Sequence, residues 1–175
     1  MTNSVTKENK KPKPRKKVAG DVIKIILDDR AHAYGHVSEH GQVIFYGLFT
    51  DRELAIDEII VLPIAFRVWV YDSALKGEKW QKLGHKPLPQ ALLEEPDAFK
   101  QDPVSGRLSI YHRRYANTDY ERPASLSECR VLERAAVWEA EHVEDRLRDH
   151  FAGVENVWLK QMEIDESKVP ADQRN

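Results

Sequence analysis

The first third of the chain alternates short apolar runs with turn-forming residues, a pattern typical of β-strands joined by tight connections. Residues 22–27 are almost continuously apolar, and residues 31–37 are rich in small residues and histidines. The aspartates and arginine at 28–30 favour a turn, so the two runs predict a hairpin. Residues 42–46 follow a second turn at Gly41 and predict a third strand. Three such strands form an antiparallel meander, the arrangement that opens many small barrels.

The hydrophobic period changes between residues 51 and 62, where apolar residues recur at the spacing of one helix face. This spacing predicts a short helix that is capped by Thr50 or Asp51 and ends before Pro63. Residues 64–71 then place Phe and Val at every second position, with Arg, Trp and Tyr between them. This alternation predicts a strand.

The middle of the chain predicts two further strands, over residues 79–83 and 107–112. Residues 87–100 between them contain scattered leucines and prolines, which predict a short helical or irregular crossing. Residues 115–122 are polar and are expected to form a loop.

The last third of the chain contains the longest predicted helix. Ser125 and Glu128 have the spacing of a capping box, while residues 129–137 fit either a helix or a strand. From Trp138 onward, apolar residues recur every three or four positions among charged ones, which predicts an amphipathic helix. Gly153 is a natural end for this helix, and Trp158 is expected to dock just after it.

These patterns together predict an α+β fold with a small antiparallel, partly barrel-like sheet and a C-terminal amphipathic helix. A chain of 175 residues has room for one ordinary domain, which we expect over residues 18–165. Residues 1–17 are lysine-rich, contain two prolines and lack large apolar side chains except Val5, so they predict a disordered arm. Residues 166–175 are expected to fray.

The net charge of -2 is the sum of two unlike parts. The arm holds seven basic side chains and one acidic one, a net +6, which leaves −8 for residues 18–175. An acidic body therefore follows a basic arm. The arm is expected to act mainly as a solubilising tail, because flexible cations without interleaved aromatic residues carry little specificity.

Cysteine content and the N-terminus indicate a reducing compartment. Cys129 is the only cysteine, which excludes an intramolecular disulfide framework and a multi-cysteine zinc site. The N-terminal segment has no apolar stretch long enough for a signal peptide or a membrane span. The expected location is the cytoplasm.

The histidines have the only spacing that resembles a metal site. His32, His36 and His40 are four residues apart, and on a strand His32 and His36 would share a face with Tyr34. A small metal-dependent hydrolase is thus one hypothesis. Polar surface histidines account for the same spacing, and neither a metal nor a cofactor is predicted.

Motifs for other chemistry are not found in the sequence. The chain lacks a Gly-x-Ser-x-Gly elbow and a glycine-rich phosphate loop, and Cys129 is expected to be a buried structural residue. An enzyme is therefore not predicted.

Nucleic-acid binding through the basic arm is the alternative function. Four aromatic residues of the β-rich body could form a stacking platform: Trp69, Tyr71, Trp80 and Tyr111. The −8 body would repel phosphates, so we favour burial of the tryptophans in the core.

Several short motifs resemble the immunity protein 26 family of bacterial polymorphic toxin systems. They lie between Gly20 and Trp158 and comprise Gly20-Asp21-Val22, Tyr34-Gly35, Val43-Ile44-Phe45-Tyr46, Ile64-Ala65-Phe66-Arg67-Val68, Gly77-Glu78-Lys79-Trp80, Leu83-Gly84, Pro87-Leu88 and Leu132-Glu133. Ile23, Ile26 and His85 depart from the pattern. The resemblance implies an α+β protein without enzymatic activity that binds and blocks a cognate toxin.

An acidic body would be steered toward a basic, nucleic-acid-targeting toxin. We therefore expect the toxin-binding residues among the exposed acids of two segments. These candidates are Asp51, Glu53, Asp57, Glu58, Glu94, Glu95 and Asp97.

Overall fold

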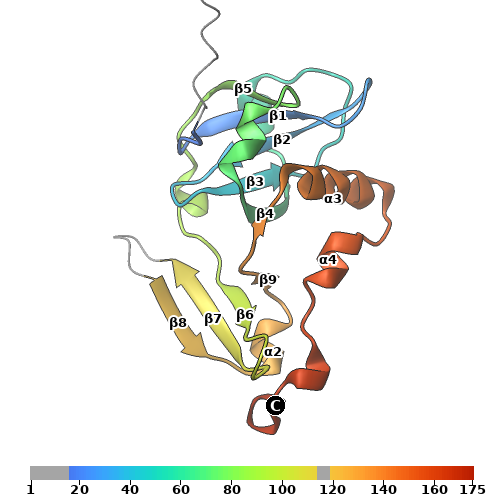
Figure 1. Cartoon of the computed structure of the whole chain (residues 1–175). Helices are drawn as coiled ribbons and strands as arrows, with labels where there is room; N and C mark the ends of the chain where they lie inside the picture. The colour runs from blue at the N-terminus through green and yellow to red at the C-terminus, as the bar shows by residue number, and fades with distance from the viewer. Residues whose placement is uncertain (1–15, 114–118) are drawn as a thin grey trace, which may run out of the picture.

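The computed structural model describes residues 16–113 and 119–175, which form two β-sheets with helices packed against them (Figure 1). The first sheet has the strand order β10-β4-β3-β2-β1-β5. Its strands are β1 (Asp21–Ile26), β2 (His32–Val37), β3 (Gln42–Tyr46), β4 (Ile64–Val70), β5 (Trp80–His85) and β10 (Val137–Trp138). All neighbours in this sheet are antiparallel except β10 and β4, which are parallel.

The second sheet has the order β8-β7-β6-β9. Its strands are β6 (Ala98–Gln101), β7 (Leu108–Arg113), β8 (Asp119–Pro123) and β9 (Glu133–Arg134). The predicted α+β fold and the predicted meander of β1, β2 and β3 are confirmed. Neither sheet closes into a barrel.

The helices are short, apart from one at the C-terminal side of the chain. The α-helices are α1 (Ile56–Ile59), α2 (Leu126–Cys129), α3 (Ala140–Ala152) and α4 (Val157–Gln161). The 3-10 helices are η1 (Asp72–Lys76), η2 (Gln90–Leu92), η3 (Glu166–Lys168) and η4 (Ala171–Gln173). The C-terminal helix is confirmed as α3, which ends at Gly153 with a φ of 68°, a conformation that glycine adopts without strain.

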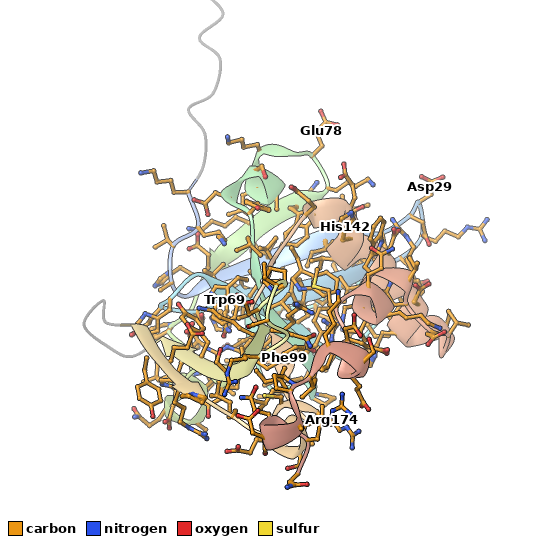
Figure 2. The ribbon with its side chains drawn as sticks, turned by 60° about the horizontal axis from the view of Figure 1, so that its bottom comes forward. Asp29, Trp69, Glu78, Phe99, His142 and Arg174 are labelled. Carbon is orange, nitrogen blue, oxygen red and sulfur yellow. The ribbon has the colours of Figure 1, made fainter. Side chains whose placement is uncertain are left out.

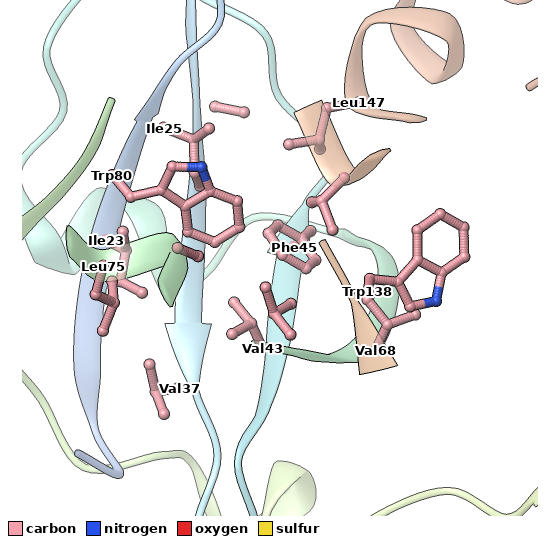
Figure 3. Packing of buried hydrophobic residues seen from close by; sticks show 14 of the residues in the cluster. Ile23, Ile25, Val37, Val43, Phe45, Val68, Leu75, Trp80, Trp138 and Leu147 are labelled. Atoms are coloured by element: carbon pink, nitrogen blue, oxygen red, sulfur yellow. The ribbon is translucent and has the colours of Figure 1, made fainter. Parts of the chain in front are cut away.

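The first sheet is buried on both faces. One face packs against α3 and η1, and Phe45 lies in the middle of this apolar cluster, between Trp80 and Trp138 (Figure 3). The other face, which carries Tyr34 and Tyr46, is covered by the connections around α1 and η2. Burial on both faces explains why β1 and β3 are almost continuously apolar.

The second sheet has one packed face. Phe99, Leu108 and Ile110 point to this face and contact Leu126 of α2 and Val169 of the C-terminal segment. The intervening residues, such as Ser109, point to the opposite face and are mostly polar and partly exposed, although Ala98 is buried there and Tyr111 contacts Trp69 of the first sheet. This alternation is the normal pattern for a sheet with one open face.

The helix predicted over residues 51–62 is reduced to α1, and its predicted cap was wrong. Ala55 is the N-cap, because the side chain of Glu58 accepts a hydrogen bond from its backbone N–H at 2.8 Å. Trp138 was expected to begin the last helix but lies in β10, where it is buried beside β4. The predicted capping box of Ser125 and Glu128 is present at the start of α2.

The polar stretch 115–122 and the C-terminal tail differ from the predictions. Of the predicted loop 115–122, residues 115–118 lie outside the described residues, and residues 119–122 belong to β8, which pairs with β7. The tail 166–175, expected to fray, packs against the second sheet. Gln173 is 5% exposed and its amide donates hydrogen bonds to the carbonyl oxygens of Leu108 and Ala124, both at 2.8 Å. These bonds tie the tail to β7.

Candidate functional site

The two acidic segments predicted to bind a partner lie on the same face of the first sheet. Leu54 and Ile59 of one segment and Leu88, Leu92 and Leu93 near the other pack into one apolar cluster. This shared cluster brings residues 51–58 and 94–97 to one side of the molecule. No local pattern in the sequence predicts that these two segments lie on the same side.

The first acidic segment is exposed and mostly paired with basic side chains. Glu53 lies 2.5 Å from Lys24 and Asp57 lies 2.8 Å from Lys86. Their side chains are each 79% exposed, so both remain accessible. Hydrogen bonding to Lys24 lowers the pKa of the Glu53 carboxyl, which therefore stays ionised at neutral pH.

Two further acids of this segment differ in their partners. Hydrogen bonds from the Ala55 backbone and then from Arg52 lower the pKa of the Glu58 carboxyl. Asp51 is exposed and makes no ion pair with any residue in the described ranges. Its charge is therefore the least neutralised of the four.

The second acidic segment contains one residue that cannot contact a partner directly. Glu94 is exposed, and Asp97 lies 2.9 Å from His112. Glu95, predicted as a surface residue, is only 4% exposed. Its carboxylate accepts a hydrogen bond from Ser38 at 3.1 Å and lies 3.8 Å from the Arg67 guanidinium. A buried carboxylate requires such partners, so Glu95 fixes the position of the segment.

Arg67 of β4 holds the same segment through its backbone. Its Nη1 donates hydrogen bonds to the carbonyl oxygens of Leu92 at 3.2 Å and Glu94 at 3.0 Å. The exposed Glu94 side chain is thus attached to a backbone that a buried guanidinium holds in place. The sequence contains no local signal for this role, because Arg67 and Glu94 are 27 residues apart.

The histidines of β2 are used in structural hydrogen bonds. His36 Nε2 donates to the carbonyl oxygen of Lys86 at 2.7 Å, and Nδ1 accepts from the Tyr46 hydroxyl at 3.1 Å. Burial lowers the pKa of His36 and raises the pKa of Tyr46 to about 12. His32 lies 2.9 Å from the Tyr34 hydroxyl. These contacts attach the connections to the sheet.

Metal-ligand geometry is not found in the part of the chain that the structure describes. Within residues 16–113 and 119–175, no three His, Cys, Asp or Glu side chains are grouped as ligands. Cys129 is buried, and this burial raises the pKa of its thiol, so the reactive thiolate is disfavoured. The predicted structural role of Cys129 agrees with this environment.

The four aromatic residues considered for base stacking do not form a platform. Trp80 is buried and its Nε1 donates to Glu144 at 3.1 Å. The rings of Trp69 and Tyr111 contact each other between the two sheets, with centroids 6.0 Å apart. Tyr71 is 48% exposed and is the exception. Most of these rings are thus occupied in packing.

The end of the predicted basic arm belongs to the folded body. Residues 1–15 lie outside the described residues, but the ammonium of Lys17 donates hydrogen bonds to the carbonyl oxygens of Gly41, at 2.9 Å, and Val70. It also lies 3.5 Å from Asp72. Burial lowers the pKa of Lys17. Lys17 therefore links β4 to the β2–β3 turn.

Comparisons with known proteins place the chain in one family. No significant match is found among curated proteins or among solved structures. Every helix within residues 16–113 and 119–175 is too short or too polar to cross a membrane. The family model described as immunity protein 26 matches residues 18–109, slightly more than half of the chain. This match includes β1 to β6 and the start of β7. The chain belongs to the immunity protein 26 family.

Proposed function

We propose that this immunity protein binds a cognate bacterial toxin stoichiometrically and occludes the surface that the toxin uses to bind its substrate. Family membership is the observation that carries the proposal, because it makes the protein an immunity protein of a toxin system. The proposed action is binding and not catalysis, and the proposed place of action is the cytoplasm, where a toxin that enters the cell would meet it.

The charge of the body supports a basic partner. Residues 18–175 carry a net −8, and an acidic surface accelerates association with a basic protein. A toxin that acts on nucleic acid needs a cationic groove for phosphates, and an acidic inhibitor could occupy that groove. We therefore propose a basic, nucleic-acid-targeting toxin as the partner.

The proposed contact surface consists of exposed acids in the connections that cover one face of the first sheet. These residues are Asp51, Glu53, Asp57, Glu58, Glu94 and Asp97. Glu95 supports them from within the fold. Asp51 and Glu94 should contribute most, because neither makes an ion pair with another residue in the described part of the chain.

Co-expression with the protein encoded by the neighbouring gene tests the function. The immunity protein should restore growth of cells that produce this toxin. The double variant D51N/E94Q should slow association with the toxin, most visibly at low salt. The matched control E78Q/E139Q removes two exposed acids elsewhere and should leave association unchanged. Of the two control residues, Glu78 lies at one end of the molecule, and Arg174 of the C-terminal tail marks the opposite end (Figure 2). Failure to restore growth would contradict the proposal.

The nucleic-acid alternative is tested by deleting residues 1–15 and not the whole arm, residues 1–17. Removal of residues 1–15 eliminates five of the seven basic side chains of the arm but keeps Lys17, which links β4 to the β2–β3 turn. Toxin neutralisation should survive this deletion. A salt-sensitive affinity for DNA or RNA that disappears with residues 1–15 would favour the alternative instead.

A further inference from the structure

A groove of about 510 Å³ with a mixed apolar and charged lining lies beside the second sheet, between the α2–β9 connection and the segment that includes α4. Figure 1 shows α4 and the chain after it running along the side of the molecule that carries β9 and α2. The apolar lining includes Phe99, Val131, Leu132, Leu159, Met162 and Ile164. The groove is therefore formed by segments that precede α3 in the chain and by the segment that follows it.

Two apolar residues of the groove are unusually accessible. Val131 is 85% exposed and Leu159 is 38% exposed. Leu132 and Ile164 are partly buried against the core of the second sheet, so they form a floor. A partner side chain that enters the groove would remove this apolar surface from water. Burial of apolar surface is the main favourable contribution to the free energy of association.

Val131 joins the groove to the proposed acidic surface. A smaller cavity of about 150 Å³ is lined by the same residues 131–134 and by Pro96, Asp97 and Arg67. Asp97 belongs to the acids proposed to contact the toxin. Asp97 therefore lies close to the groove, and one partner can contact both.

The charge around the groove selects the occupant. The charged side chains that line it are three acids, Glu133, Glu163 and Glu166, and two arginines, Arg130 and Arg134, a surplus of one negative charge. Glu163 lines the groove and makes no ion pair within the described residues, whereas Glu133 and Glu166 are paired with Arg146 and Arg130. The surplus of negative charge favours a basic partner segment.

We propose that this groove binds an apolar side chain of the toxin that is flanked by basic residues. This inference rests on the proposed function and adds an apolar anchor to the electrostatic contact. Interfaces commonly have this organisation, with a small desolvated centre and a polar rim.

Substitution of Val131 tests the groove without disturbing the core. V131K places a cation at the mouth of the groove and should weaken binding to the purified product of the neighbouring gene by about tenfold or more. V131E should weaken binding less, because its charge is complementary to a basic segment. V104K is the matched control, since Val104 is 93% exposed on the β6–β7 turn and does not line the groove.

The outcomes separate the groove from the function. If wild-type protein binds the toxin and V131K binds within twofold of V104K, the groove proposal is wrong and the immunity function stands. If V131E is weakened more than V131K, the basic character of the occupant is wrong. If wild-type protein does not bind at all, the proposed function itself fails. Circular dichroism of V131K checks its fold, and V131S repeats the test with a smaller change.

Discussion

The two sheets of this immunity protein differ in how much of their surface is buried. The first sheet packs apolar residues on both faces, whereas the second has one packed face and one that carries polar and aromatic side chains such as Lys100 and Tyr111. The first sheet therefore has the properties of a rigid scaffold. The second sheet has fewer apolar contacts, and it borders the groove and relies on the C-terminal tail for cover. We infer from this difference that the first sheet supplies most of the stability. The proposed partner contacts lie in the acidic connections that cover one of its faces and in the groove beside the second sheet.

Replacement of Phe45 in the first sheet should have the largest effect on stability. The side chain is fully buried and its ring contacts those of Phe66 and Trp80 at centroid distances of 4.9 and 5.9 Å. F45A should lower the free energy of unfolding by about 3–5 kcal/mol, measured by urea denaturation. A loss below about 1 kcal/mol would show that the first sheet is not the main source of stability.

Replacement of Gln173 tests how far the second sheet depends on the tail. The side chain accepts a hydrogen bond from Leu108 N–H at 2.9 Å, besides donating two to carbonyl oxygens. Q173A should cost about 2–4 kcal/mol, because a buried group left without a partner costs about 1–3 kcal/mol. Urea denaturation measures the cost, with the exposed Asp172→Ala as the control. Equal stability of Q173A and wild type would mean that the tail frays.

Replacement of Lys17 tests the attachment of the arm to the first sheet. K17M keeps the aliphatic stem but removes the ammonium that bonds to Gly41 and Val70, and should cost about 1–2 kcal/mol. K16M is the control, because Lys16 is exposed and makes no hydrogen bond or ion pair within the described residues. Equal melting temperatures of K17M and K16M would contradict a structural role for Lys17.

The pH dependence of stability should report the buried histidine of the first sheet. Burial lowers the pKa of His36 in the folded protein, while an unfolded histidine titrates near 6.5. The unfolded chain therefore binds a proton more readily, and the free energy of unfolding is fully present above about pH 6.5 and falls as the pH decreases below it. Carboxyls with a lowered pKa, such as that of Glu53, contribute in the same direction only near pH 4.5 and below.

Denaturation at several values between pH 7.5 and 5.5 checks this prediction. H36Q should flatten the decrease, even if it also lowers the overall stability. A wild-type stability that stays constant across this interval would show that His36 is not buried in its neutral form.

Sequence patterns predicted the parts of the fold in which burial and local period agree. The first three strands, the capping box of Ser125 and the end of α3 at Gly153 are local features of this kind. β8 was missed because an edge strand with one open face can be polar throughout. The tail was missed because its stability comes from Gln173, a single polar residue that bonds to a strand 65 residues away.

The candidate site shows the same limit. The sequence identified exposed acids such as Asp51 and Glu94, but it could not show that Glu95 is buried, because its partners Ser38 and Arg67 are distant in the chain. Val131 was also not singled out. An isolated valine is no signal in a sequence, and its exposure becomes significant only beside the groove that α4 completes.

Titration of toxin activity with the purified immunity protein tests the central proposal most directly. The activity of the protein encoded by the neighbouring gene should decrease linearly with added immunity protein and reach the background at a molar ratio of about one, as stoichiometric occlusion requires. Toxin activity that remains unchanged in the presence of a molar excess of the immunity protein would contradict the proposed function.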